Sequence, residues 1–385
     1  MGASVGGPRQ RGWARTTGWT AVVLLAACPS ADPDPEPTPA DWVVEVPASG
    51  PLPEDLADLG LFRWDPSTEE FTWNDGVVPY DLNSPLFSDY AEKARALWLP
   101  EGGAMTYDGN DAFAFPDGAV LLKNFLLPAD LRAPDEDLTL IETRILVKQE
   151  GRWQAWPYVW DGDSAALDPS GEVIDVSVVG HDGEPVAFTY LVPQRNQCAQ
   201  CHELDSDDGR YITPIGPKAR HLNRDEDLGD GPLNQLTRFA ALGMLDGLPG
   251  DGVDVAWDAR TTGDPALLGD EDLNEAARDY LDINCAHCHN PAGVNGISSQ
   301  LFLNHDNEND FNLGICKAPG SAGEGTGGFS YDIVPGNPDE SILVYRMVTD
   351  ELGAIMPLLG RSLVHEEGVA LVSEWIRRME PDDCE

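Results

Sequence analysis

The chain has 385 residues, enough for about two domains, and its 42% hydrophobic and 24% charged residues are typical of soluble globular proteins. Its 67 acidic residues far outnumber its 24 basic residues and give a formal net charge of −43. This excess argues against nucleic acid as a partner and against attraction to an anionic membrane surface, and it favours partner proteins with a cationic docking face.

The first 27 residues are typical of a lipoprotein-type signal peptide. Basic residues up to Arg15 precede an apolar run from Trp19 to Ala27, which is too short to remain in a bilayer as a permanent span. The stretch Leu25-Ala26-Ala27-Cys28 closes this run and looks like a bacterial lipobox. We therefore expect cleavage before Cys28 and attachment of a lipid to its thiol, with an ordinary signal peptide as the alternative.

Residues 28–40 predict a stiff tether. Proline alternates with acidic residues over this stretch, which cannot bury enough apolar surface to fold and which proline keeps extended. A lipid, a tether and a folded body together predict an exported protein, periplasmic or on the cell surface, that is anchored to the membrane without spanning it.

Residues 41–193 predict an N-terminal antiparallel β-rich domain. Runs of β-branched and aromatic residues show partial alternation with polar ones, and turns such as Glu150-Gly151 and Asp161-Gly162 separate them. The expected strands lie at residues 119–127, 138–149, 152–160, 172–179 and 186–192.

The pentapeptide Cys198-Ala199-Gln200-Cys201-His202 lies in the segment 194–267 and has the C-x-x-C-H spacing of covalent haem attachment. Its two thiols can add to the two vinyl groups of one porphyrin, and its histidine can then bind the iron. Met244 is the preferred sixth ligand, His221 and His181 are its rivals, and an open iron site is a further alternative.

A second C-x-x-C-H pentapeptide, Cys285-Ala286-His287-Cys288-His289, lies in residues 268–385 and directly follows a predicted helix over 271–283. Together the two motifs predict two covalently bound haem c groups. Met356 is followed by proline in a Gly/Pro-rich stretch and is the expected sixth ligand of the second haem, with Met347 as its rival.

Three more helices are expected around these motifs. Apolar spacing predicts a short helix that begins near Leu233 and ends near Gly243. Asn337 is the expected N-cap of another helix, since proline occupies its first turn and glutamate the capping-box position. A final helix over 367–379 should stop before Pro381.

Other uses of the cysteines remain open. A zinc site built from the four motif thiolates, or a pair of redox-active disulfides, is the alternative to haem. With Cys28 lipidated, Cys316 and Cys384 are left over. Export permits a disulfide between them, but the sequence does not show whether they lie close enough.

Acidic residues flank the first motif at positions 203–208 and 225–227. Negative charge stabilises Fe(III) relative to Fe(II), although exposed carboxylates are screened by salt. We therefore expect the first haem to have the lower reduction potential.

The order of helix, C-x-x-C-H, long loop region, Met-Pro and C-terminal helix resembles a class I cytochrome c domain over residues 268–381. The fold class expected for the chain is therefore α+β multidomain, with a mainly α-helical cytochrome c-type haem region after the β-rich domain. The chain also resembles, from about residue 52 to 380, a family of exported bacterial di-haem c-type cytochromes of undetermined role. The matching stretches are residues 78–90, 141–144, 214–218 and 333–338.

The resemblance implies two covalent haems and electron transfer with redox partner proteins, and it implies no particular substrate. An electron-transfer protein is the leading interpretation, ahead of a stand-alone catalyst. One alternative is a di-haem oxidoreductase such as a peroxidase, with an open sixth position on one haem. Another makes the β-rich domain a docking module that delivers electrons to a bound partner.

Overall fold

The computed structural model describes residues 42–228, 231–293, 298–323, 325–382 and 384. The expected signal peptide over 1–27, the tether over 28–40 and the lipidation site Cys28 lie outside the described residues. Within the described ranges, no helix is both long enough and apolar enough to cross a membrane.

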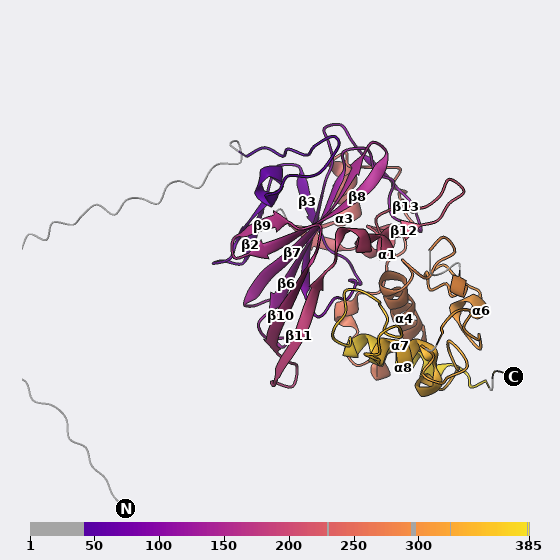
Figure 1. Cartoon of the computed structure of the whole chain (residues 1–385). Helices are drawn as coiled ribbons and strands as arrows, with labels where there is room; N and C mark the ends of the chain where they lie inside the picture. The colour runs from indigo at the N-terminus through magenta and orange to yellow at the C-terminus, as the bar shows by residue number, and fades with distance from the viewer. Residues whose placement is uncertain (1–41, 229–230, 294–297, 324, 383, 385) are drawn as a thin grey trace, which may run out of the picture. The chain divides into compact units, whose positions relative to one another are not determined.

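An antiparallel six-stranded sheet forms the largest part of the β-rich region (Figure 1). Its spatial order is β3-β4-β6-β7-β8-β9, so that most neighbours in space are also neighbours in sequence. The expected N-terminal antiparallel β-rich region is thereby confirmed. The strands are β3 (Val77–Tyr80), β4 (Glu92–Trp98), β6 (Val120–Pro128), β7 (Leu138–Gln149), β8 (Arg152–Asp161) and β9 (Ser164–Leu167).

Smaller strand pairs surround this sheet. The pairs β1–β2 and β10–β11 are antiparallel hairpins, and β5 pairs in parallel with β16 from a distant part of the chain. Two further short antiparallel pairs follow the first motif. Their bounds are β1 (Phe62–Asp65), β2 (Glu70–Trp73), β5 (Met105–Thr106), β10 (Glu172–Val179), β11 (Pro185–Val192), β12 (Glu203–Leu204), β13 (Tyr211–Ile212), β14 (Asp225–Asp227), β15 (Pro232–Asn234) and β16 (Leu245–Asp246).

The two faces of the sheet have different roles because successive side chains of a strand point to opposite sides. One face carries Ala96, Leu122 and Ile145 into the largest apolar core. The other face contributes to two smaller cores, one around Leu121 and one around Phe125. Lys123 lies between these two residues on β6, so this second face carries a polar position between two apolar ones.

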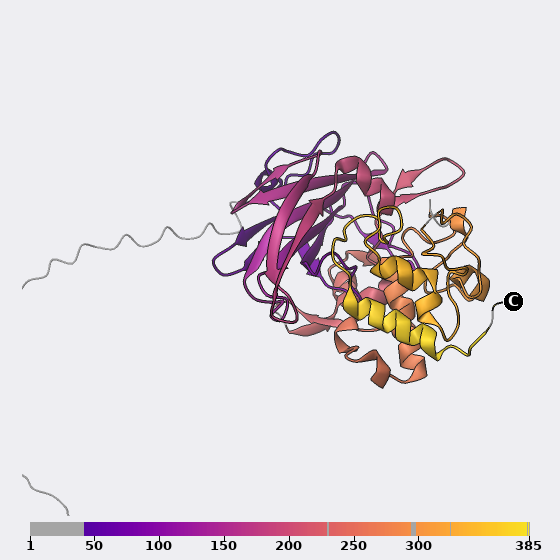
Figure 2. The same ribbon diagram turned by 60° about the horizontal axis from the view of Figure 1, so that its bottom comes forward.

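Residues 268–384, which we call the helical part, contain the longest described α-helices. Figures 1 and 2 both place α7 and α8 beside α4. Gly368 of α8 lies directly against the Tyr280 ring of α4. The Trp375 indole donates a hydrogen bond to Asn274 Oδ1 over 3.0 Å. The described α-helices are α1 (Ala199–His202), α2 (Ala219–Leu222), α3 (Gln235–Ala241), α4 (Asp270–Asn284), α6 (Asp310–Leu313), α7 (Ile342–Val348) and α8 (Glu366–Arg378).

Two expected helix starts differ from the structure. Asn337 makes no side-chain cap, because residues Pro338–Glu340 form a separate 3-10 turn and α7 begins only after Ser341. The Ser341 hydroxyl instead donates to the Asn337 carbonyl and accepts the Val334 amide. Leu233 belongs to the short strand β15, so the expected helix near it begins at Gln235.

Hydrogen bonds connect the β-rich region with the helical part. The Asn284 side chain at the end of α4 accepts the Phe87 amide over 2.8 Å. The buried carboxylate of Asp89 accepts the amides of Ser362 and Leu363, 2.6 and 2.7 Å away, just before α8. The described residues from Trp42 onward accordingly belong to one compact unit.

Candidate functional site

Residues of the two C-x-x-C-H motifs line two adjoining cavities, and Cys201 and His287 line both of them. The first, which we call the His289 cavity, encloses about 1260 Å³ including space open to solvent. Its lining includes Cys285, Cys288, His289, Met347 and Met356. The structure therefore brings the second motif together with both methionines that the sequence proposed as sixth ligands.

His289 is half-buried at the wall of its cavity. Burial lowers the pKa of His289 to about 4, although the Leu301 carbonyl acts in the opposite direction, so the imidazole is neutral at pH 7. Its Nδ1 atom is buried, and no described residue is its partner in hydrogen-bond geometry. A neutral imidazole is the form that binds iron, so the ring fits the proposed axial role.

The two methionines reach this cavity from different elements. Met347 is buried in α7 and belongs to the apolar core around α4 and α8. Met356 lies in the loop between α7 and α8, and its carbonyl accepts a hydrogen bond from Arg361. The loop methionine has no place in that core, so the expectation that Met356 is the ligand stays a prediction that this arrangement favours.

The second, which we call the His202 cavity, encloses about 1230 Å³ including space open to solvent. Cys198, Cys201 and His202 line it together with residues 214–217. The opposite wall comes from the six-stranded sheet and includes Lys123. A segment that begins at Arg195 as a 3-10 turn and continues as α1 presents the motif to the cavity.

His202 has the environment of a metal-binding histidine. Its Nδ1 lies 2.9 Å from the Thr213 carbonyl oxygen and can donate a hydrogen bond to it. This leaves Nε2 free, which is the usual arrangement of an imidazole that binds a metal through its second nitrogen. Burial lowers the pKa of His202 to about 4, so the ring is neutral at pH 7.

None of the three proposed sixth ligands of the first haem lines the His202 cavity. Met244 packs in the core around Leu121, and its carbonyl accepts the Met105 amide. His221 is fully buried with its Nε2 3.3 Å from Asp282. His181 lies on the surface of the β-rich region near Glu367. The structure thus leaves Met244 and both rivals apart from His202.

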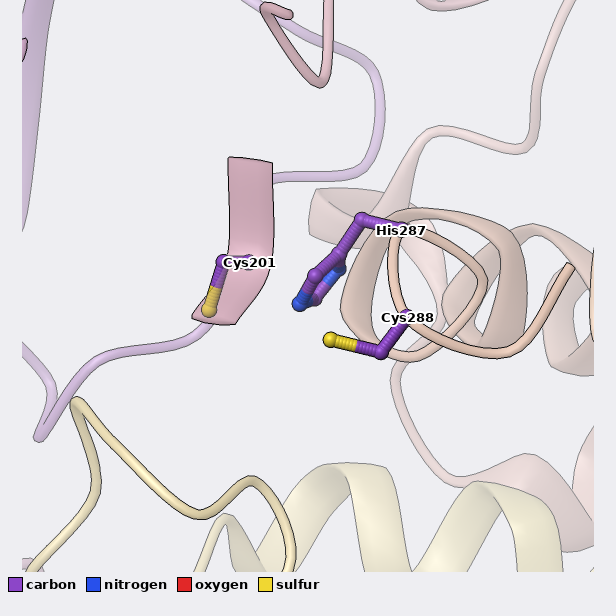
Figure 3. Close-up of side chains that lie close together, drawn as sticks. All are labelled: Cys201, His287 and Cys288. Atoms are coloured by element: carbon purple, nitrogen blue, oxygen red, sulfur yellow. The ribbon is translucent and has the colours of Figure 1, made fainter. Parts of the chain in front are cut away.

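The two motifs meet at their second cysteines. Cys201, His287 and Cys288 lie with one ligand atom each within 4.8 Å of one another. Figure 3 shows the His287 ring and the Cys288 thiol pointing toward Cys201. Cys288 Sγ also lies 3.1 Å from the Gln200 carbonyl. The hydrogen bond with Cys288 and the neighbouring His287 hold the pKa of the Cys201 thiol well below its usual range.

This junction bears on the other uses of the cysteines. Among the described residues, none of the four motif cysteines takes part in a disulfide, so neither C-x-x-C pair is bridged in this structure. Cys198 and Cys285 lie in different cavities, so the four thiolates are not assembled into one zinc site. Cys201, Cys288 and His287 form a smaller group that could hold a metal ion when its thiols are unmodified.

Cys316 and Cys384, the two cysteines left over in the sequence, are joined by a disulfide. Their Cα atoms lie 4.9 Å apart, across 68 residues of sequence. The bond ties the C-terminus to the loop region of the helical part.

The acidic residues that flank the first motif do not line its cavity. Glu203 pairs with Arg210 over 3.3 Å on the surface, and residues 205–208 are half-buried or exposed. The sheet instead presents Arg95, Lys123 and Arg144 to the cavity.

Sequence reasoning missed these cations, although one signal was available. Lys123 is the only charged residue in strand β6, which is apolar apart from Lys123 and Asn124.

Comparison with protein-family models, with curated proteins and with solved structures finds no match to this chain.

Proposed function

We propose that this protein is an exported di-haem c-type cytochrome that transfers electrons through two covalently attached haems. One observation carries the proposal: the proximal histidine of each C-x-x-C-H motif lines a different one of two adjoining cavities, and burial lowers the pKa of each histidine to about 4. Haem, when bound, supplies an iron that changes reversibly between Fe(II) and Fe(III).

The residues of the chain would hold and orient the two groups. Thioether bonds would form at Cys198 and Cys201 in one cavity and at Cys285 and Cys288 in the other. The Thr213 carbonyl would fix the ring orientation of His202 through Nδ1. The apolar lining of each cavity would limit access of water to the iron.

We also propose that residues 268–381 form a class I cytochrome c-like region. Support comes from the order of its parts, since α4 leads into the second motif and α8 follows the Met356 loop. The close contact between Gly368 of α8 and Tyr280 of α4 holds the two flanking helices together.

Counting haems in three variants tests the proposal. The protein is produced with haem-attachment machinery, and haem is measured by pyridine haemochrome absorbance and intact mass. Wild type should carry two haems, and Cys198→Ala/Cys201→Ala and Cys285→Ala/Cys288→Ala should carry one each. Cys316→Ala/Cys384→Ala, which removes the same number of cysteines outside the motifs, should keep two.

The mass of the same samples distinguishes the alternatives. A colourless wild-type protein with no added haem mass would refute the proposal. If metal analysis of that protein found zinc that is lost in Cys201→Ala and Cys288→Ala, the group around His287 would be a metal site instead.

A peroxidase-type oxidoreductase is the second candidate, favoured by one observation. Met244, His221 and His181 do not line the His202 cavity, so none of them would supply a sixth ligand to an iron bound there. An open iron binds small ligands. Cyanide should then change the absorbance of one haem in wild type, and a spectrum indifferent to cyanide and peroxide would exclude this candidate.

A further inference from the structure

The wall of the His202 cavity carries three cationic residues in one row. Arg95 of β4 is the register partner of Lys123 of β6, which is in turn the register partner of Arg144 of β7. All three residues line the cavity. Side chains directly opposite each other on neighbouring strands lie close together, and like charges in such positions destabilise a sheet. A negatively charged group near such a row would therefore stabilise the sheet.

The carboxylates of the chain compensate this row only in part. Glu142 pairs with Arg144, and it also accepts a hydrogen bond from the Tyr190 hydroxyl. Asp81 lies 3.4 Å from Arg95, but it is shared with Arg224 at 3.1 Å. Arg95 is only 5% exposed, and its Nη2 atom has no hydrogen-bond partner among the residues that the structure describes.

Lys123 is the least compensated member. Among the residues that the structure describes, its Nζ makes no hydrogen bond or ion pair and lies 4.8 Å from the centre of the Phe125 ring. Burial lowers the pKa of Lys123 well below its usual value, and the neighbouring cations Arg95, Lys93 and Arg144 act in the same direction. A bound anion would reverse this effect of the neighbouring charges.

We propose that Arg95, Lys123 and Arg144 form an anion site that binds a carboxylate inside the His202 cavity. The inference rests on the proposed function, because the cavity is the one assigned to the first haem. The carboxylate comes either from a propionate of that haem or from a small free carboxylic acid. In both cases the β-rich region is a wall of the haem site as well as a scaffold.

Removing the charge of Lys123 should change the reduction potential of the haem in the His202 cavity in a predictable direction. A positive charge near the iron favours Fe(II), so its removal favours Fe(III). Lys123→Met removes the charge without removing a protein hydrogen bond, and Lys123→Arg keeps the charge. Arg152→Met, on the exposed end of β8, changes the net charge equally and is the matched control.

The experiment measures both haem midpoints by spectroelectrochemistry in protein with two haems confirmed by pyridine haemochrome. In Lys123→Met, one midpoint should shift downward and the other should stay, while Lys123→Arg and Arg152→Met should resemble wild type. Replacing chloride by acetate at constant ionic strength identifies the source. A downward shift with acetate in wild type but not in Lys123→Met indicates a free carboxylate, and indifference to acetate indicates a propionate.

Two results would overturn the anion site. One is a Lys123→Met midpoint equal to that of Arg152→Met in protein that carries both haems. The other is a change of iron spin state in Lys123→Met, which would assign Lys123 to the iron itself. Protein without covalent haem would instead refute the proposed function, and the inference with it.

Discussion

Removing the charge of Asp282 should destabilise the protein strongly, because this carboxylate links Lys218 and His221 to α4. Lys218 Nζ lies 2.9 and 3.0 Å from its two oxygens, and the His305 amide donates to it over 3.2 Å. His221 Nε2 lies 3.3 Å away. Asp282 is only 2% exposed. In Asp282→Asn, an amide NH2 group would face the Lys218 ammonium.

The expected loss in the free energy of unfolding is about 3 kcal/mol. Breaking a buried ion pair by removing one partner costs about 3–5 kcal/mol, and asparagine keeps one acceptor oxygen, which places the loss at the lower end. Urea unfolding followed by tryptophan fluorescence measures it. Asp270→Asn is the control, because Asp270 is 90% exposed in its pair with Arg378 and should lose about 1 kcal/mol or less.

We expect the effect of Asp282→Asn on the free energy of unfolding to depend on pH. Burial disfavours the charged form of Asp282, but the hydrogen bond from His221 and the charge of Lys218 outweigh it and hold the pKa well below its usual range. A carboxylate whose pKa is lower in the folded state stabilises the protein above its unfolded pKa of about 4, and this stabilisation is lost as the pH falls. The difference between wild type and Asp282→Asn should therefore shrink below about pH 4. A difference below about 1 kcal/mol at pH 7, or one that grows on acidification, would refute this reasoning.

Two further substitutions test the helical part. Cys316→Ala/Cys384→Ala should lower the free energy of unfolding by about 4 kcal/mol, because the disulfide closes a long loop of 68 residues in the unfolded chain. Urea titration measures this loss. A loss below about 1 kcal/mol would contradict the expectation that the disulfide stabilises the protein by restricting the unfolded chain. Gly368→Ala should cost about 1–3 kcal/mol, since its Cβ would overlap the Tyr280 ring and separate α8 from α4. Gly250→Ala, where a Cβ meets open space, should leave the thermal midpoint unchanged, and equal midpoints for both glycine variants would contradict the close helix contact.

Local patterns in the sequence predicted the long strands and helices well. The expected strands over 138–149 and 172–179 coincide with β7 and β10, because alternation of side chains and Gly-containing turns are both local signals. The helix expected over 271–283 differs from α4 by one residue at each end. Spacing predicted the bounds of these segments but not their whole burial pattern, since β7 buries Glu142 and α4 buries Asp282.

The residues that line the His202 cavity could not be predicted from the sequence, because tertiary packing determines them. Met244 follows the first motif at a plausible distance along the chain, yet its neighbours in α3 and β16 place it in an apolar core away from His202. The acidic residues after the first motif are near it in sequence but outside its cavity. The cations of the cavity wall come instead from strands that precede the motif by 54 to 103 residues, counted from Cys198 to Arg144 and to Arg95.

The lining of the His202 cavity has a consequence for biogenesis. It comes from segments as far apart in sequence as β3 and the loop residues Pro357, Leu359 and Gly360, together with the thiols of the first motif. On the proposed function, an attachment enzyme would reach these thiols most readily on a nascent, still extended polypeptide. The prosthetic group would then be present when the sheet and the late loop come together, and it would act as a template for folding.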